Sequence, residues 1–325
     1  MKSPRSVTIA ITGKCNLACK HCFYADEMRK YDDLPTDRWL AFIKECGDAA
    51  VMYITLTGGE PFMRPDIFEI IDAIVKNRMR FSILTNGTLV TKDIAKRIAD
   101  TGRVRRVQVS VDGDEASHEW MRGKGTYKKA LDAVRFLSDA GVFVGVAMSI
   151  PKYKTTDVYS AVKAVKYAGA GVATLSYPLA MGSALDNQNE FNCPHDERCS
   201  HNERPVIDLD ERLEDFEDIL TNLWSKERSL YSKNWYPQNS ANKHCRIAEI
   251  SVFVSSEGVI SPCSNISLEN EIRIGDAPLS TIWSLNRELV LIRQGKKEVG
   301  QLCPSLRDGR VVFTISTRRF NNAAI

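Results

Sequence analysis

The chain has 325 residues, of which 43% are hydrophobic and 26% are charged, so it can bury a full core without disulfide bonds. Its formal net charge is +3, with basic and acidic residues interspersed, which excludes nucleic acid and membrane surfaces as expected main partners. The amino terminus has only a short apolar run, too short for a secretion signal or a membrane span. We therefore expect a cytoplasmic protein, whose nine cysteines serve metal binding or catalysis.

Short β-branched apolar runs alternate with segments of helical periodicity over the first half of the chain. This alternation is typical of βα units on a parallel sheet, so we expect an α/β fold. The predicted strands are residues 7–11, 51–56, 80–85, 104–111, 142–150 and 172–177. The predicted helices are residues 36–46, 65–77, 91–99, 126–139 and 157–168.

The pattern changes in the second half of the chain. Residues 181–205 are polar and predict a long loop, whereas residues 208–226 predict an amphipathic helix. From Cys245 onward, strand and turn signals and a short helix at 279–284 predict a small α+β unit. The expected domains are residues 1–229 and residues 230–325.

Three cysteines, Cys15, Cys19 and Cys22, lie on one short loop directly after the first predicted strand. Three thiolates on a tight loop can bind three irons of a four-iron, four-sulfur cluster and leave the fourth iron for a small chelating molecule. A zinc site that includes His21 is an alternative, but structural zinc normally takes two ligand pairs from separated elements. Three buried core cysteines are a further alternative, which the polar neighbours of these residues disfavour.

The spacing Cys-x3-Cys-x2-Cys in CNLACKHC resembles the signature of radical S-adenosylmethionine (radical SAM) enzymes. The resemblance implies a partial (β/α)6 TIM barrel, a [4Fe–4S] cluster and S-adenosylmethionine bound to its open iron. In that family the reduced cluster passes an electron to the sulfonium, and a 5′-deoxyadenosyl radical then abstracts hydrogen from the substrate. A flavodoxin-type or ferredoxin-type reductant is the implied partner.

Later strand ends resemble the cofactor-binding motifs of the same family. TGGEP at 57–61 resembles the GGEP motif, which binds the methionyl amino group, and VSVDG at 109–113 resembles a motif near the ribose and carboxylate. The turn at 85–87 also matches a common family turn, although ordinary turn and packing roles stay open for several of these residues. The implied cofactor-binding residues are Tyr24, Gly58, Gly59, Glu60, Pro61, Asn86, Ser110, Asp112 and Ser149.

Two further residues keep alternative roles. Phe23 flanks the last cysteine of the loop, where the family commonly places a ring beside adenine, and core packing is the alternative. His118 is expected in the loop after the fourth strand, within a stretch similar to the family's D…H…RG segment. There it could contact substrate or cofactor, and a capping or surface role is equally open.

A second cysteine pattern surrounds the predicted hairpin VFVSSEGVISPC at 252–263, which turns at Gly258. With IRIGDAPLSTIWS after it, this pattern resembles the opening of the SPASM or twitch auxiliary-cluster domain. Too few cysteines follow for a full SPASM domain, so a smaller, twitch-like ligand set for an auxiliary iron–sulfur cluster is implied. Its members are Cys245, Cys263 and Cys303.

Cys193 and Cys199 lie in the predicted long loop. Either could complete the auxiliary cluster or act as a catalytic thiol that donates a hydrogen atom to a substrate radical, and without a fourth protein ligand that cluster would keep an open iron. An unligated polar loop is an alternative. Zinc held together with His195 and His201 is another, disfavoured because the ligands are too close in sequence.

The resemblance leaves the substrate open. The predicted barrel begins at about residue 7 with no recognition domain before it, which favours a small polar metabolite or sugar-like molecule that is oxidised, epimerised or rearranged. The alternative is maturation of a ribosomally made peptide or protein, by thioether formation, carbon–carbon crosslinking or epimerisation. A non-catalytic iron–sulfur or zinc scaffold is the remaining hypothesis.

Overall fold

The protein is described here by a computed structural model. The described residues are 3–22, 24–25, 32–149, 158–176, 183, 187, 251–263, 271–286, 289–291 and 312–316. The predicted helix at 208–226 and the predicted domain boundary lie outside them, as does nearly all of the predicted loop at 181–205. The division into two domains therefore stays a prediction.

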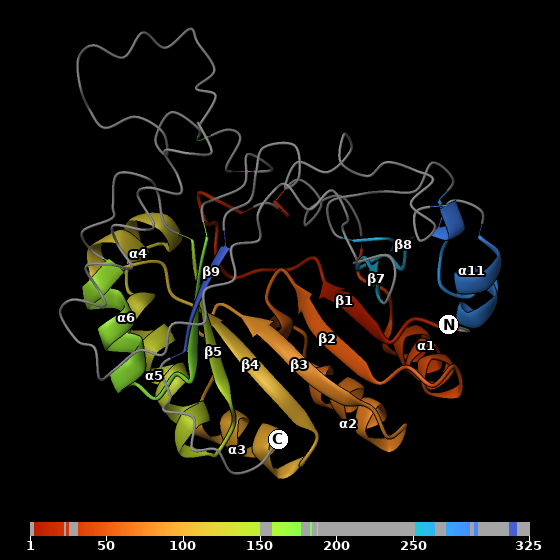
Figure 1. Ribbon diagram of the computed structural model, residues 1–325, viewed down its shortest axis with the longest axis horizontal. Coiled ribbons are helices and arrows are strands. Elements are labelled where there is room, and N and C mark those ends of the chain that lie inside the picture. The colour runs from red at the N-terminus through yellow and green to blue at the C-terminus, as the bar shows by residue number, and fades with distance from the viewer. Residues whose placement is uncertain are drawn as a thin grey trace, which may run out of the picture.

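The described strands form one sheet in the order β8-β7-β1-β2-β3-β4-β5-β6-β9. The first six run parallel and in sequence order, as predicted for the α/β fold (Figure 1). They are β1 Ser6–Thr12, β2 Tyr53–Gly58, β3 Arg80–Thr85, β4 Val104–Ser110, β5 Val144–Ser149 and β6 Val172–Ser176. The others are β7 Ser251–Val254, β8 Ile260–Ser261 and β9 Val312–Ser316.

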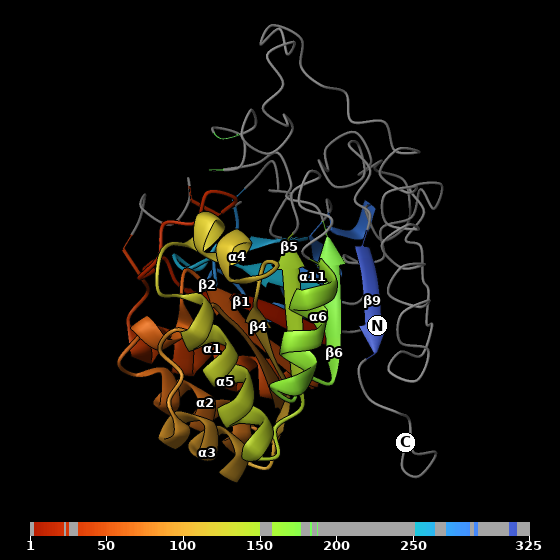
Figure 2. The same cartoon turned by 90° about the vertical axis from the view of Figure 1, so that its left-hand side faces the viewer.

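Helices follow the strands and cover one face of the sheet (Figures 1 and 2). The five predicted helices are confirmed, with ends that differ by up to two residues. They are α1 Thr36–Asp48, α2 Ile67–Lys76, α3 Lys92–Asp100, α5 Tyr127–Asp139 and α6 Val158–Tyr167. A short 3₁₀ helix, η1 Pro61–Met63, follows β2 directly.

One helix was not predicted: α4, Glu115–Arg122, occupies the segment expected to be a loop. The Asp114 carboxylate accepts a hydrogen bond from the Ser117 N–H, which caps its first turn, and Gly123 at φ 108° ends it. The segment is short, polar and bounded by Gly113 and Gly123, and these features favour a loop, although Asp114 before it and Gly123 after it are also helix-capping residues. The expectation that His118 lies in a loop is therefore wrong.

The two faces of the sheet differ in polarity. Strand residues that point toward the helices are buried and apolar, for example Leu56 in β2 and Phe81 in β3. Residues of the opposite face include many hydroxyls: the register pairs Thr8 with Thr55 and Thr55 with Ser82. Because alternate residues of a strand point to opposite faces, the inner face of the partial barrel is polar.

The predicted hairpin at 252–263 is confirmed as β7 and β8, with Gly258 at φ 86° in the turn. β7 pairs parallel with β1, and β9 pairs antiparallel with β6, so both edges of the six-stranded sheet are extended. The predicted short helix is confirmed as α11, Leu279–Leu285. It is tied to α1, since the Leu279 N–H donates to the Glu45 carboxylate.

No helix among the described residues combines the length and apolar character needed to cross a bilayer.

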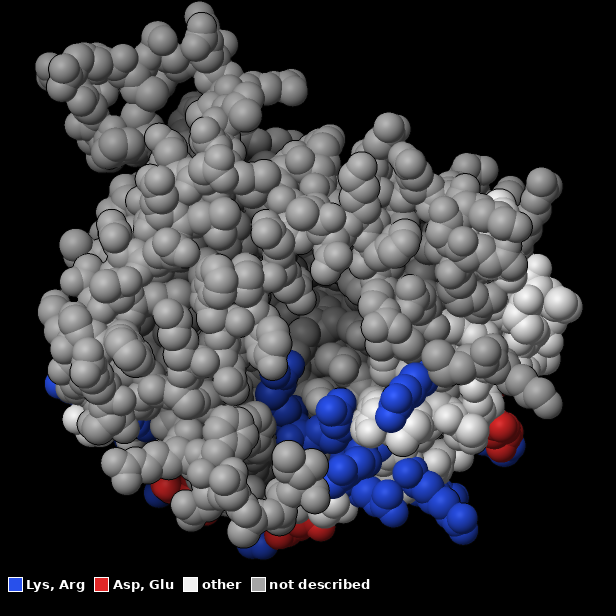
Figure 3. All heavy atoms as spheres, viewed as in Figure 1, with Lys and Arg blue, Asp and Glu red and all other residues white. Residues whose placement is uncertain are grey.

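Basic side chains gather locally on one part of the surface. Figure 3 shows Lys and Arg concentrated in the lower part of the view, where β2, β3 and β4 begin in Figure 1. Arg80, Arg103 and Arg105 near these strand starts are exposed, and the Arg105 guanidinium lies 4.1 Å from the centroid of the Tyr53 ring. The even mixing of charges along the sequence does not reveal this concentration.

Two leucines test how far the buried face determines stability. Leu56 is 0% exposed and Leu285 is 74% exposed. We expect Leu56→Ala to lower the free energy of unfolding by about 2–5 kcal/mol, because a cavity remains, and Leu285→Ala to change it by less than about 0.5 kcal/mol. Urea unfolding followed by circular dichroism measures both, and equal effects would contradict the assignment of the core face.

Candidate active site

The cysteine loop leaves β1 at the carboxyl-terminal end of the parallel strands. Cys15, Cys19 and Cys22 are all partly buried. Burial raises the pKa of the Cys19 thiol to about 11, and the charges of Cys22 and Cys15 act in the same direction. Burial likewise raises the pKa of Cys15, so the thiolate forms of Cys15 and Cys19 are disfavoured unless a metal stabilises them. This arrangement fits the three protein ligands of an iron–sulfur cluster.

The GGEP turn holds this loop through its backbone. The Gly59 N–H donates to the Thr12 carbonyl and the Glu60 N–H to the Lys14 carbonyl, both at 2.8 Å. A Cβ on Gly58 would lie 2.3 Å from the Thr12 oxygen, and one on Gly59 would lie 2.2 Å from the Lys14 oxygen. Both positions therefore require glycine for the approach of the cysteine loop, apart from the cofactor contact predicted for them.

The Glu60 carboxylate is fully buried and is held by protein groups. It accepts hydrogen bonds from the Thr85 hydroxyl at 2.7 Å, the Asn86 N–H at 2.7 Å and the Phe62 N–H at 3.2 Å. Burial raises the pKa of Glu60, although these hydrogen bonds oppose that shift. Glu60 thus fixes the turn after β3 to the GGEP turn, and its predicted contact with the methionyl ammonium stays a prediction.

A second polar link joins the turn after β3 to the cysteine loop. The Asn86 side-chain amide donates to the Asn16 side-chain oxygen at 2.9 Å, and the Asn16 amide donates to the Thr88 hydroxyl at 2.8 Å. Asn16 was not among the predicted site residues. Its position between two of the cysteines, within CNLAC, is the signal that could have indicated it.

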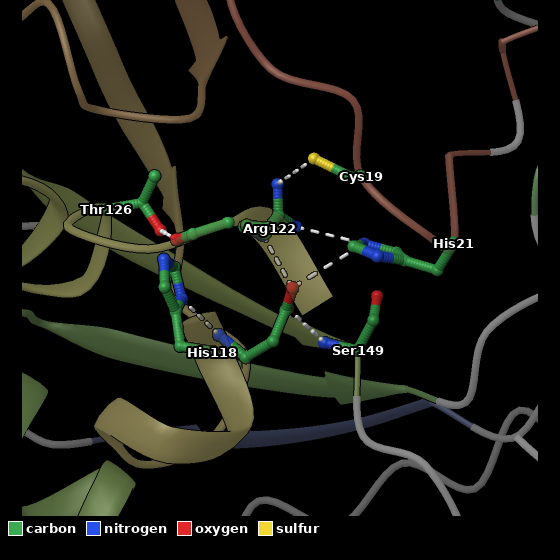
Figure 4. A network of polar contacts seen from close by, with 8 residues as sticks. Cys19, His21, His118, Arg122, Thr126 and Ser149 are labelled. Atoms are coloured by element: carbon green, nitrogen blue, oxygen red, sulfur yellow. Dashed lines mark hydrogen bonds and ion pairs between the residues drawn. The ribbon is translucent and has the colours of Figure 1, made fainter. Parts of the chain in front are cut away.

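The end of β4 carries a buried charge network (Figure 4). The Asp112 carboxylate is 2.5 Å from the Arg122 Nε, 3.5 Å from the His21 Nε2, and accepts the Ser149 N–H at 2.8 Å. Arg122 also lies 3.1 Å from the His21 Nε2 and 3.9 Å from the Cys19 sulfur. α4 therefore connects the strand end to the cysteine loop.

The ionisation states of Asp112 and His21 are set by burial and by the neighbouring Arg122 guanidinium. Burial would raise the pKa of Asp112, but the Arg122 guanidinium and His21 more than offset this, and the net pKa is lowered. Burial lowers the pKa of His21 to about 4, with Arg122 acting in the same direction, so the imidazole is neutral at pH 7. Asp112 is therefore an anion paired with a cation, and both lie beside the cysteine loop.

The zinc alternative for this loop finds no support. Within the described residues, no three side chains of the types His, Cys, Asp or Glu lie where they could ligate one metal ion. His21 instead faces Arg122 and Asp112. A single zinc ion needs its ligands within about 2.3 Å of one point, whereas a four-iron cluster distributes three cysteines over three separate irons.

His118 is buried rather than at the surface. Its Nδ1 accepts a hydrogen bond from the Asp112 N–H at 3.1 Å, and its ring packs edge-on against Tyr127 with centroids 5.6 Å apart. The surface role considered for His118 is therefore wrong. The imidazole terminates β4 and fixes the backbone of Asp112.

Other predicted site residues are placed as follows. Tyr24 packs edge-on against Phe253 of β7, with ring centroids 6.5 Å apart. Ser110 ends β4 and is half-buried, next to Ala147 on the inner face. Cys263 follows β8, and its carbonyl accepts a hydrogen bond from the Ser261 hydroxyl at 3.0 Å. The positions outside the described residues are Phe23, Cys193, Cys199, Cys245 and Cys303.

Removal of one cluster ligand has a matched control in this chain. We expect Cys19→Ala to lose about four irons per chain after anaerobic reconstitution, because a cluster needs all three thiolates of the loop. Cys46→Ala, at a 0% exposed position of α1, is expected to keep them. Iron analysis and the visible spectrum measure the difference, and full iron content in Cys19→Ala would exclude the loop as the cluster site.

His118 makes stability depend on pH. Burial lowers its pKa from 6.5 to about 4, so between these values the unfolded chain binds a proton that the native state does not. The free energy of unfolding therefore rises as the pH increases through this window, by at most about 1.4 kcal/mol per pH unit. We expect His118→Asn, which can accept the same hydrogen bond without titrating, to have a shallower slope in urea unfolding. An unchanged slope would show that His118 does not titrate in this way.

Comparison with known proteins agrees with this geometry. Residues 9–164 match the model of the Radical SAM superfamily. The sporulation killing factor maturation protein SkfB of Bacillus subtilis is 26% identical over 263 residues, 80% of this chain and 60% of that protein. The AdoMet-dependent heme synthase of Nitratidesulfovibrio vulgaris is 25% identical over 314 residues, 93% of this chain and 85% of that enzyme.

A solved structure agrees with the fold. The crystal structure of Streptococcus suis SuiB bound to precursor peptide SuiA superposes with a TM-score of 0.66 at 17% identity, covering 94% of this chain and 71% of that one. The partial-barrel architecture is thereby confirmed, while the chain spans 60% of the length of SkfB. A [4Fe–4S] cluster and S-adenosylmethionine are the cofactors of the matched superfamily. This chain carries a domain of the radical SAM superfamily.

Proposed function

We propose that this chain uses radical SAM chemistry to modify a peptide or protein substrate. The observation that carries the proposal is the loop of Cys15, Cys19 and Cys22 at the carboxyl ends of the parallel strands, within the segment that matches the family. SkfB is a maturation protein, and SuiB was crystallised with a precursor peptide. These similarities favour the peptide alternative over the small-metabolite hypothesis.

In this proposal some residues of the chain would bind the cluster and others would orient S-adenosylmethionine. Cys15, Cys19 and Cys22 hold the cluster, which together with S-adenosylmethionine supplies a radical able to abstract hydrogen. The backbone of Gly59 and the side chain of Ser110 face the space beside the loop in this proposal and orient the methionyl and ribose groups. Glu60, Asn86, Asp112 and Ser149 support these positions through the hydrogen bonds described above.

The polar inner face of the sheet suits a peptide. Thr8, Thr55 and Ser82 are register neighbours on this face, and their hydroxyl groups can each donate and accept hydrogen bonds. A peptide backbone presents donors and acceptors along its whole length. This face therefore offers partners for a substrate chain laid across the strands.

The auxiliary cluster and the reductant belong to the same proposal. Cys263 would bind an auxiliary iron–sulfur cluster together with Cys245 and Cys303, and Cys193 or Cys199 would complete it or donate a hydrogen atom to the substrate radical. A flavodoxin-type or ferredoxin-type protein would supply the electron. About eight irons per chain would support two four-iron clusters, and about four would leave the second set of cysteines without a metal.

A second candidate has one specific observation in its favour. The AdoMet-dependent heme synthase of Nitratidesulfovibrio vulgaris is matched over 85% of its length, whereas SkfB is matched over 60%. This similarity supports a tetrapyrrole as the second candidate substrate. An iron porphyrin is an aromatic, carboxylate-bearing molecule, so its recognition would depend on apolar and basic groups rather than on the hydroxyls of the inner face.

The two candidates predict different products. The reconstituted chain is reduced with dithionite under anaerobic conditions and given S-adenosylmethionine with either a short peptide encoded by a neighbouring gene or an iron porphyrin carboxylic acid. We expect 5′-deoxyadenosine in both mixtures, because the cofactor chemistry precedes substrate modification, and a mass change in the peptide alone. Mass spectrometry measures both products.

Control variants and outcomes separate the radical SAM chemistry from the choice of substrate. Cys19→Ala should form no 5′-deoxyadenosine, whereas Cys46→Ala should form it. A change in the porphyrin with an unchanged peptide would favour the second candidate. No 5′-deoxyadenosine from a fully iron-loaded wild-type chain would remove both and leave the scaffold hypothesis.

A further inference from the structure

Arg122 is placed where a cation can act on the cysteine loop. Its side chain is 11% exposed, and it extends from the last residue of α4 toward the loop (Figure 4). One arm of the guanidinium, Nη1, lies 3.9 Å from the Cys19 sulfur, and the other, Nη2, lies 3.1 Å from the His21 Nε2. The contact with Cys19 is long for a hydrogen bond to sulfur but falls well within the range of a strong electrostatic interaction.

The loop does not need this guanidinium to stay in place. The Lys20 N–H donates to the Met121 carbonyl at 3.0 Å, and the Lys20 ammonium lies 4.3 Å from the centroid of the Trp120 ring. On its other side the loop is fixed by backbone hydrogen bonds to Gly59 and Glu60. A purely structural role would therefore be largely redundant, which raises the question of what the charge does.

Asp112 controls how much of that charge reaches the cysteine. The carboxylate has 0% exposure and lies 2.5 Å from the Arg122 Nε, so it partly neutralises the guanidinium from the side away from Cys19. The pair is thus oriented, with its positive end toward the sulfur. Burial keeps water from screening the pair, so its field at the loop is stronger than that of an exposed pair.

We propose that Arg122 is a positioning residue that raises the reduction potential of the cluster bound by Cys15, Cys19 and Cys22. The proposal rests on the proposed function, since it needs a cluster on this loop. Reduction adds one electron from the external reductant to the cluster, and no bond breaks. The added negative charge is spread over the cluster sulfurs and cysteine ligands, so a cation and an N–H donor at Cys19 stabilise the reduced form.

The proposal predicts opposite shifts of the reduction potential in two variants, which a purely structural role would not produce. In Arg122→Gln the cation is lost, and we expect at least a tenfold lower ratio of reduced to oxidised cluster at a fixed solution potential, equivalent to 59 mV for one electron. In Asp112→Asn the cation is no longer neutralised, and the ratio is expected to rise. Arg122→Lys keeps the charge but not the planar fork, so its ratio should lie between wild type and Arg122→Gln.

Arg64 supplies a matched control. It also pairs with an aspartate: its Nε lies 2.9 Å from the Asp66 carboxylate, with side-chain exposures of 7% for Arg64 and 18% for Asp66, and its Nη1 donates to the Ile11 carbonyl at 3.0 Å. Arg64→Gln therefore breaks a comparable pair, and none of its contacts among the described residues is to a cysteine. We expect it to leave the potential unchanged.

The experiment is an anaerobic potentiometric titration of the full chain without S-adenosylmethionine, at one pH and ionic strength, with the reduced cluster followed by electron paramagnetic resonance. Potentials that shift in the same direction in Arg122→Gln and Asp112→Asn would overturn the proposal, as would an unchanged potential in Arg122→Gln. Should Arg122→Gln fail to bind iron, the other two variants decide. A reduction potential above wild type in Asp112→Asn and below wild type in Arg122→Lys would support the proposal, and any other pair of shifts would overturn it. A wild-type chain that binds no cluster would instead refute the proposed function.

Discussion

The buried pair between Asp112 and Arg122 is the interaction that sets the charge of the site. Burying two charges costs free energy that only good geometry and further hydrogen bonds can offset, and here the carboxylate also accepts the Ser149 N–H. The pair joins β4, β5 and α4 at one point. Through Arg122 it extends to the cysteine loop, so a residue about 100 positions away in the sequence sets the surroundings of Cys19.

The cysteine loop is held from two opposite sides by different chemistry. On the side of β2, backbone hydrogen bonds and two glycines bring the GGEP turn against the loop with no room for a side chain. On the side of β4, charged and aromatic side chains of α4 reach across to it. A site held in this way is preorganised, because its ligands need little rearrangement when a cofactor binds.

The sequence is sufficient to predict the strands and the first cysteine motif, because both depend on local patterns. The parallel strands are β-branched runs bounded by turns, and Cys15, Cys19 and Cys22 lie within eight residues. Arg122 belongs to the D…H…RG segment, but its partners could not be identified in this way. Its contact with the cysteine loop exists only once α4 forms, and the sequence predicts a loop for that segment.

The glycines of the GGEP turn and His118 show a second limit. The residue types were identified from the sequence, but the partners that require them were not. Gly58 and Gly59 admit the backbone of the cysteine loop, and His118 accepts a hydrogen bond from a strand end. A motif identifies the residue types that are present, whereas the strand register and the packing determine which of their atoms are in contact.

The pairing of β7 with β1 has a consequence for synthesis of the protein. β1 carries the cysteine loop and is hydrogen-bonded on one edge to β2, but its other edge is completed by residues 251–254, far later in the chain. On a ribosome, which makes about 5–20 residues per second, that edge stays open for many seconds after β1 emerges. An open strand edge is an aggregation hazard, so a nascent chain of this protein would benefit from a chaperone until residues 251–254 have emerged.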